Sequence, residues 1–167
     1  MKKIALTLAA AATLLSLPAA AQFQKPEDAI KYRQAAFTLM GNHFGRIAAM
    51  AQGKAPFDAK AAAENASLLV SLSRLPVAAF GEGTDKGAPT RAKAEIWKDG
   101  AKFKAAAEKL TSEIAKLDTA AKTGSLDAIK AAVGGVGGAC KGCHDDFRAE
   151  RHSRSEEHTS ELQSPMY

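Results

Sequence analysis

The 167-residue chain is poor in aromatic residues (6%), and beyond Leu17 it has no further long apolar run. Few aromatic and β-branched residues disfavour a strand-based core and favour helix. The lack of such runs excludes a membrane-spanning helix beyond Leu17. The net charge is +5, but no basic run or interleaved aromatics accompany it, so nucleic acid is not indicated as a partner.

The two ends of the chain differ from its middle. Residues 1–21 indicate a secretory signal peptide, because two lysines precede an apolar run from Ile4 to Leu17 and a small-residue cleavage site at 19–21. That run is short for a bilayer span, so no membrane anchor is expected after cleavage. Residues 153–167 carry no helical stripe and are expected to be a disordered, non-native-looking tail. Residues 22–152 suit one domain with one core.

Alanine, lysine, glutamate and leucine dominate residues 22–152, which favours helix throughout. Breaks rich in glycine or proline at 53–56, 81–89 and 123–124 divide this part into four segments. Each segment repeats apolar residues at alternating three- and four-residue steps. This pattern predicts an all-α fold, an antiparallel up-down-up-down four-helix bundle. A three-helix arrangement with one loose helix is the alternative.

The stripes also predict which side chains point inward. In the first helix, beginning near Pro26, these are Ile30, Arg33, Phe37, Met40, Phe44 and Ile47. The second helix, with Asp58 as its N-cap and Pro76 bending or ending it, shows Leu68, Leu72 and Leu75. The third is expected to run unbroken through Ile96, Gly100, Phe103, Ala107, Leu110, Ile114 and Leu117. The fourth shows Leu126, Ile129, Val133, Val136, Cys140, Cys143 and Phe147.

The most specific motif is Cys140-Lys141-Gly142-Cys143-His144, which holds both cysteines of the chain. It matches the Cys-x-x-Cys-His signature of c-type haem attachment. On one helical turn, two thiols can bond covalently to a porphyrin while the histidine reaches the iron. The motif therefore predicts one covalently attached haem c, with His144 as an axial ligand.

Three other interpretations of the cysteines are weaker. A disulfide at this spacing is strained within a helix and closes almost no loop. A thioredoxin-like redox pair needs neighbouring strands, and no strand pattern is present. Zinc usually takes four ligands, whereas this cluster offers three.

Residues of the first helix supply candidates for the surroundings of the haem. Arg33 lies among apolar inward positions, so it needs an anion such as a haem propionate, or must extend to solvent from the bundle end. Phe37, one turn on, either covers the iron opposite His144 or is ordinary core. Met40 is either core or a sixth iron ligand, which would make a low-spin electron carrier. His43 is off the stripe and is expected to be solvated.

Near the motif, Arg148 follows His144 by four residues. It lies either over the same haem face or on the surface, paired with an acidic neighbour at 145 or 146. Five glycines precede or enter the motif, at 134, 135, 137, 138 and 142. Their cost in a helix suggests close approach of the macrocycle and a neighbouring helix, or a poorly formed helical turn.

The chain resembles the cytochrome c′ family, the class II c-type cytochromes. The resemblance spans nearly all of residues 22–151 and rests on QFQKPEDAIKYRQAAFTLM, LPVAAFGEGT, EIW and the late CKGCHDDFR. It implies a high-spin, five-coordinate iron with His144 as its proximal ligand. Cys140 and Cys143 would hold the haem through thioether bonds. The resemblance further implies a propionate contact at Arg33 and a distal covering residue at Phe37. Phe80 would help to wall the haem pocket, and Arg148 would be the proximal basic residue beside His144.

The resemblance also implies a non-enzymatic periplasmic homodimer that binds NO and CO and can transfer electrons to a redox partner of unspecified identity. A dedicated low-spin electron carrier, with Met40 or another side chain as sixth ligand, is the rival function. A peroxidase or NO reductase is disfavoured, because no acid–base residue is expected near Phe37.

Overall fold

A computed structural model describes residues 23–150. Its helices are α1 (Pro26–Ala51), α2 (Ala59–Leu72), the 3-10 turn η2 (Val77–Ala79), the single turn α3 (Glu95–Lys98), α4 (Gly100–Lys122) and α5 (Leu126–Phe147). Within this range no strand forms, and one isolated bridge joins Ala92 to Arg148. The signal peptide predicted at 1–21 and the tail predicted at 153–167 lie outside the described residues.

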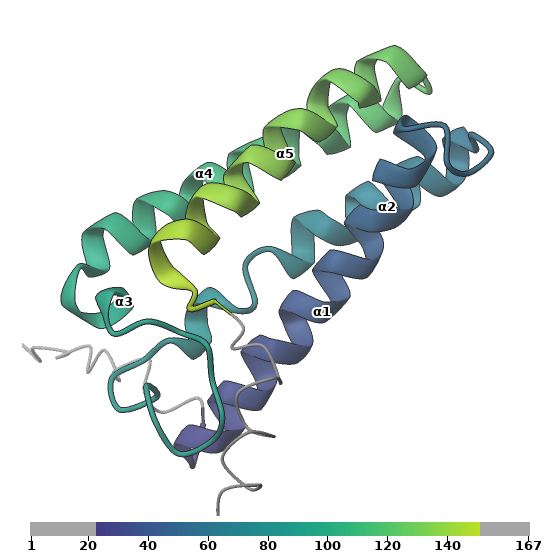
Figure 1. Cartoon of the computed structure of the whole chain (residues 1–167). Helices are drawn as coiled ribbons and strands as arrows, with labels where there is room; N and C mark the ends of the chain where they lie inside the picture. Colours follow the sequence, from purple (N-terminus) through teal and green to yellow (C-terminus); the bar gives the residue numbers. More distant parts are fainter. Residues whose placement is uncertain (1–22, 151–167) are drawn as a thin grey trace, which may run out of the picture.

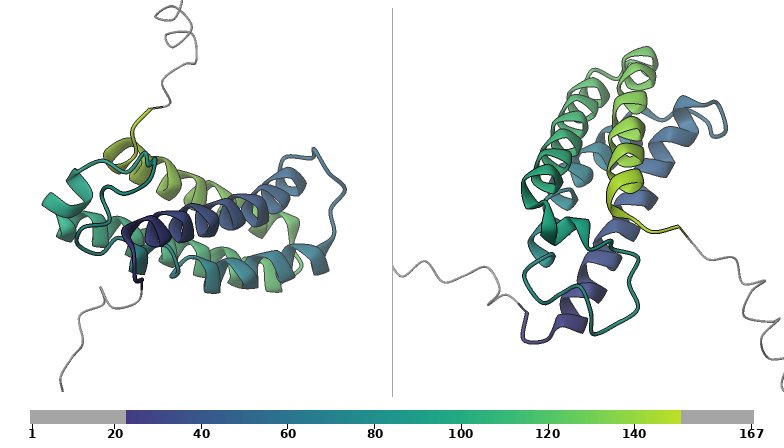
Figure 2. Two further views of the ribbon diagram at one scale, coloured as in Figure 1. Left: turned by 90° about the horizontal axis from the view of Figure 1, so that it is seen from below. Right: turned by 60° about the vertical axis from the view of Figure 1, so that its left-hand side comes forward.

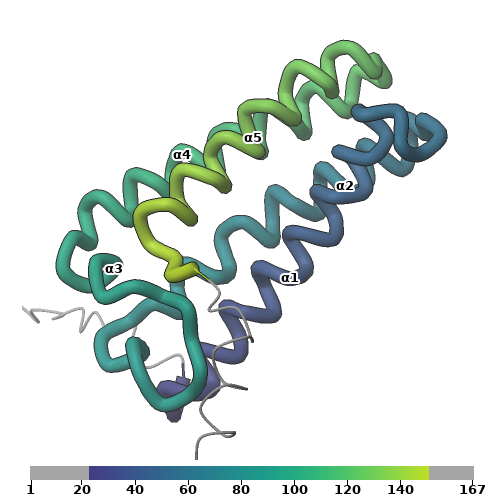
Figure 3. Tube along the Cα trace, viewed as in Figure 1, coloured from purple at the N-terminus to yellow at the C-terminus, as the bar shows by residue number. Residues whose placement is uncertain are grey.

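The four long helices form the predicted bundle. Successive long helices run in opposite directions, as the tube in Figure 3 shows. α1 contacts α2, α2 contacts α4, α4 contacts α5, and α5 closes the ring against α1 (Figure 1). The residues between α2 and α4 gather at one end of the bundle, near the last turn of α5 (Figure 2). None of the helices within residues 23–150 has the length and apolar character to cross a bilayer.

Several local signals act as the sequence predicts. Pro26 stands in the first turn of α1, where its missing N–H costs nothing. The Asp58 carboxylate caps α2 by accepting a hydrogen bond from the amide of Ala61 at 2.9 Å. α2 ends at Leu72, four residues before Pro76. Gly124 adopts a φ of 71° just beyond α4, a conformation that glycine takes without a Cβ clash.

The inward face predicted for α2 is wrong at two of its three leucines, whereas Leu72 is partly buried and packs against the main core. Leu68 is 49% exposed and Leu75 is 39% exposed, whereas Ala62, Ala66 and Leu69 are buried. The face that packs is rich in alanine, and its small methyl groups let α2 lie close to both α1 and α4. Leucine size was therefore a poorer guide to burial than the position of the alanines.

The prediction of an unbroken third helix is also wrong. The chain leaves helical geometry at Asp99, whose φ is −124° and ψ is 64°. Its carboxylate then accepts a hydrogen bond from the amide of Lys102 at 3.0 Å and starts α4 as a new helix. The apolar period continues across the break, because Ile96 and Phe103 are both buried in one small cluster with Phe147.

His43 differs from its predicted solvated position. Its ring nitrogen Nδ1 lies 2.7 Å from Oδ1 of Asn65, which joins α1 to α2, and the histidine is half-buried. The amide group of Asn65 in turn donates a hydrogen bond to the carbonyl of Ala61 at 2.7 Å. The pair is a polar link between two helices that are otherwise joined by apolar contacts.

The glycines before the motif lie inside a continuous α5, so a poorly formed turn is ruled out. Close approach of another helix can explain the glycine only at position 135 of the five, because a Cβ on Gly135 would meet the Glu113 carboxylate on α4. At Gly134 a Cβ would meet no atom within 4 Å. Helix packing therefore does not explain most of these glycines.

We expect Gly134→Ala to stabilise the protein by about 0.5–1 kcal/mol, because alanine is the better helix former and the added methyl group has room. Urea unfolding measures this change. Gly135→Ala is the matched control: the Glu113 side chain must move, so its gain should be smaller. A loss of stability in Gly134→Ala would contradict the prediction.

Candidate haem site

A cavity of about 510 Å³ opens between α1 and α5 at the end of the bundle where residues 81–94 cross. Its volume lies in the range of about 300–1,000 Å³ typical of small-molecule sites. Its lining is mostly apolar, with polar groups at one end. The residues predicted for the site all line it: Arg33, Phe37, Met40, Phe80, Cys140, Cys143, His144 and Arg148.

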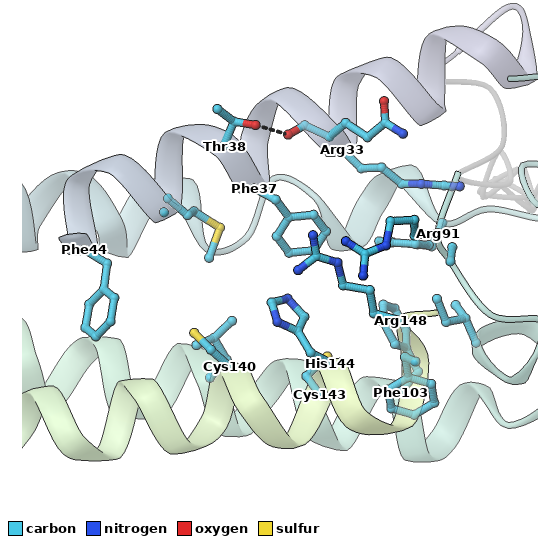
Figure 4. Close-up of a pocket in the computed structure, with 18 of the residues that line it drawn as sticks. Arg33, Phe37, Thr38, Phe44, Arg91, Phe103, Cys140, Cys143, His144 and Arg148 are labelled. Carbon is cyan, nitrogen blue, oxygen red and sulfur yellow. Dashed lines mark hydrogen bonds between the residues drawn. The ribbon is translucent and has the colours of Figure 1, made fainter. Parts of the chain in front are cut away.

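The wall from α5 carries the motif. Cys140, Cys143 and His144 occupy positions i, i+3 and i+4 of one helix, so all three face the cavity (Figure 4). Both cysteines are half-buried free thiols, so the disulfide interpretation is not supported. Burial raises the pKa of both thiols, which keeps them protonated, unlike the low-pKa thiolate of a redox pair.

The imidazole of His144 sits in an environment that favours its neutral form. Burial lowers its pKa, and the positive charges of Arg148 and Arg91 lower it further, while Asp145 acts in the opposite direction. A neutral imidazole has a ring nitrogen lone pair available for a metal. The site therefore presents His144 in the form that can bind iron.

The facing wall comes from α1. Phe37 points from α1 into the cavity and faces His144 (Figure 4). Phe37 is 37% exposed, so it is not ordinary core. Met40 is buried in the main core and also borders the cavity, so both of its predicted roles remain open. Toward the C-terminal end of α1 the lining continues with Met40, Gly41 and Phe44, whereas the polar side chains of Arg33, Gln34 and Thr38 lie beside and before Phe37.

Arg33 is the most unusual side chain of the site, since it is charged and only 2% exposed. Its Nη1 donates to the carbonyl of Ala79 at 3.1 Å and to Oγ1 of Thr84 at 3.0 Å. Its Nη2 donates to the carbonyl of Thr84 at 2.8 Å and to Oγ1 of Thr90 at 3.3 Å. The guanidinium carbon also lies 4.3 Å from the ring centre of Phe80, within cation–π range.

These contacts exclude one of the two interpretations of Arg33. Extension to solvent is wrong, because the guanidinium is enclosed by the loop after α2. Burial lowers its pKa, and the charge of nearby Asp85 partly opposes that shift. All four hydrogen-bond acceptors are neutral, so none of the groups bonded to the guanidinium neutralises its positive charge beside the cavity. A propionate contact stays a prediction. Independently of it, Arg33 stabilises the loop after α2 through its hydrogen bonds to Ala79 and Thr84.

Aromatic rings form the end wall of the cavity. Phe80 lies at their centre, with ring-centre distances of 6.3 Å to Phe37, 6.0 Å to Trp97 and 4.9 Å to Phe103. Phe103 in turn meets Phe147 at 5.3 Å in an edge-on arrangement. Figure 4 shows Phe103 close to the last turn of α5. Phe80 lines the cavity, and its role in walling a haem stays a prediction.

The sequence analysis did not single out Arg91, although it lines the cavity and acts on His144. It belongs to an irregular segment with no periodic pattern, so no sequence signal separated it from other surface arginines. Arg148 is exposed and borders the cavity. Its two acidic neighbours form ion pairs with lysines, Asp145 with Lys141 and Asp146 with Lys102.

The residues present fit a covalently held haem. The cavity is apolar where a macrocycle would lie and cationic at one end, where carboxylates would lie. The thiols and the imidazole come from one face of one helical turn. In contrast, no group of three or more His, Cys, Asp or Glu side chains between residues 23 and 150 is gathered closely enough to hold a bare metal ion.

Comparison with known proteins decides the family. A family model described as cytochrome C′ matches residues 28–148. The chain belongs to the cytochrome c′ family. A cytochrome c′ of Rubrivivax gelatinosus is 67% identical over 127 residues, which cover 76% of this chain and 98% of the relative. One from Alcaligenes xylosoxydans xylosoxydans is 49% identical over 130 residues, covering 78% and 100%.

Solved structures agree with this assignment. The crystal structure of cytochrome c′ from Rubrivivax gelatinosus has a TM-score of 0.74 at 67% identity, covering 76% of this chain and 99% of that chain. A nitric oxide complex of a mutant cytochrome c prime from Alcaligenes xylosoxidans has a TM-score of 0.73 at 48% identity, covering 78% and 100%. The four-helix bundle is therefore confirmed, and the cofactor of the family is one covalently attached haem c.

Proposed function

We propose that this protein binds NO and CO at a five-coordinate, high-spin haem iron. The observation that carries the proposal is the composition of the two cavity walls: α5 offers two thiols and one imidazole, and α1 offers Phe37 opposite that imidazole. When bound, the haem supplies an iron with one open coordination position. Among the solved relatives are a nitric oxide complex and a carbon monoxide complex of Alcaligenes cytochrome c prime variants.

In this proposal each side chain has a separate task. Cys140 and Cys143 hold the haem through thioether bonds, and His144 binds the iron as the single protein ligand. Phe37 covers the opposite side and offers the iron no donor atom, so only a small uncharged molecule fits there. Phe80 walls the cavity, Arg33 provides a positive charge for a propionate, and Arg148 lies beside His144.

We further propose that the protein is not an enzyme. Apart from His144, the residues lining the cavity include no histidine and no acidic residue. Peroxide chemistry needs an acid–base group on the open side of the iron, and Phe37 and Met40 cannot act as one.

Redox cycling of the iron makes electron transfer a secondary role. We also propose export of residues 22–152 to the periplasm, by the signal peptide at 1–21, and a homodimer.

The rival function is a low-spin electron carrier with Met40 on the iron. It is favoured by one observation, the presence of the Met40 side chain in the lining of the same cavity. An optical and resonance Raman spectrum of the reduced protein separates the two functions. A high-spin, five-coordinate signature that changes on CO addition is the expected result. A sharp low-spin α band without CO reactivity would overturn the proposal.

We expect Phe37→Ala to speed CO binding about ten- to a hundred-fold, because the ring that covers the iron is removed. That change corresponds to about 1.4–2.7 kcal/mol in the barrier. Flash photolysis of the CO complex measures the association rate. Phe57→Ala is the control, since it removes an equally exposed ring from the α1–α2 loop, outside the cavity. Equal rates in wild type and Phe37→Ala would exclude the covering role.

A further inference from the structure

Residues 89–93 border the cavity through Thr90, Arg91 and Ala92. Figures 1 and 3 show the chain rising from the start of α1 to the last turn of α5 before it enters α3. We call residues 89–93 the strap. It has no regular secondary structure, so its position depends on the contacts at its two ends.

The first end of the strap is held by α1. The side-chain amide of Gln34 donates a hydrogen bond to the carbonyl of Pro89 at 2.9 Å. The next strap residue, Thr90, accepts from Nη2 of Arg33 at 3.3 Å, and its hydroxyl also accepts from the amide of Ala92 at 3.2 Å. Two successive residues of α1 therefore hold two successive residues of the strap.

The second end is held by the end of α5 through backbone pairing. The amide of Lys93 donates to the carbonyl of Phe147 at 2.9 Å, and the amide of Ala149 donates to the carbonyl of Arg91 at 2.8 Å. These bonds flank the antiparallel bridge between Ala92 and Arg148. A helix otherwise leaves its last carbonyls without a backbone partner, so the strap stabilises the terminal turn.

Two side chains of the strap reinforce this pairing. Nε of Arg91 donates to the carbonyl of Ala149 at 2.8 Å, so Arg91 and Ala149 are joined by two hydrogen bonds. Nζ of Lys93 donates to the carbonyl of Asp145 at 2.9 Å. Asp145 directly follows His144, and the carbonyl of His144 accepts from the amide of Arg148. The strap therefore contacts the chain directly after His144, at residues 145, 147 and 149.

We propose that Arg91 is a positioning residue for His144: by bonding Ala149 it holds the last turn of α5 and sets the direction in which the imidazole meets the iron. This inference rests on the proposed function, in which His144 is the iron ligand. Removal of a partner that orients a ligating histidine typically costs about 10- to 100-fold in metal affinity or activity. Here the orienting contact acts through the backbone rather than on the ring.

The test compares Arg91→Ala and Arg91→Lys with wild type in the haem-loaded protein. Lysine keeps the positive charge but has a methylene group where arginine has Nε, so it loses the bond to Ala149. Arg74→Ala is the control, because it removes the same charge from an exposed position beyond α2. The readouts are the iron–histidine stretching frequency of the reduced protein and amide hydrogen exchange at Lys93 and Ala149.

Both Arg91 variants should shift the iron–histidine band to lower frequency and speed exchange of the Ala149 amide about five- to ten-fold, as loss of one net hydrogen bond allows. Arg74→Ala should change neither. Lys93→Ala should give a smaller shift in the same direction, and it serves if Arg91→Ala does not fold. The inference would be overturned if both Arg91 variants kept the wild-type iron–histidine frequency and the wild-type exchange rate of the Ala149 amide. It would also be overturned if Arg91→Lys alone kept both wild-type values. A wild-type protein without a histidine-ligated, five-coordinate haem would instead overturn the proposed function, while the exchange result still tests the strap.

Discussion

Replacing Cys140 and Cys143 together with serine is expected to leave the chain without covalently bound haem. A serine hydroxyl does not form the thioether that each thiol can form, and residues 23–150 contain no other cysteine. The loss should be complete, because the double substitution removes both thiols of the chain. Mass spectrometry of the purified chain and haem staining on a denaturing gel measure the attachment.

His144→Ala is the matched control for that experiment. It removes the iron ligand from the same turn of α5 but leaves both thiols facing the cavity. The mass of this variant should still include one haem, whereas its spectrum should lose the histidine-ligated signature. Haem that survives denaturation in the double serine variant would show that the tethers lie elsewhere, and would overturn the attachment proposed here.

The second large effect is expected at Arg33. Replacing it with methionine should destabilise the protein by about 3 kcal/mol, because an orphaned buried acceptor typically costs about 1–3 kcal/mol. The carbonyl of Thr84 loses its guanidinium donor, the carbonyl of Ala79 keeps only a long bond from Oγ1 of Thr84 at 3.4 Å, and the stacking on Phe80 is weakened as well. Urea unfolding of the holoprotein measures the difference.

Arg46→Met is the control, since Arg46 lies on the exposed side of the same helix and should cost little. Arg33→Lys should also destabilise, because one ammonium group cannot reproduce the four bonds of the planar guanidinium. A change of redox potential in Arg33→Met would support the propionate contact. A loss below about 1 kcal/mol with an unchanged potential would contradict both roles of Arg33.

The attachment motif could be recognised without the fold because its chemistry is local. The spacing of Cys140, Cys143 and His144 places them on one face of any helix, whatever surrounds it. The regular period of the α1 stripe likewise placed Phe37 on the inward side, but it left open whether Phe37 covers the iron or is ordinary core. Both predictions needed only the geometry of a single helix.

The α2 face failed because burial depends on a neighbour rather than on the residue. Leu68 is the more apolar side chain, but Ala66 is the one that α1 and α4 can approach. A single helix with apolar residues on more than one side has several possible inward faces. Which face of α2 is buried depends on how closely the neighbouring helices α1 and α4 can approach it, that is, on the distances between the helix axes.

From the sequence by itself came the number of long helices, their order and the haem-binding turn, because period, caps and motif spacing all act within one segment. The tertiary structure decided the partners of Arg33, the aromatic wall around Phe80 and the place of Arg91 next to His144. These features join residues far apart in the chain through an irregular loop. No period or propensity describes such a loop, so its path is set by long-range hydrogen bonds that exist only once the bundle has formed.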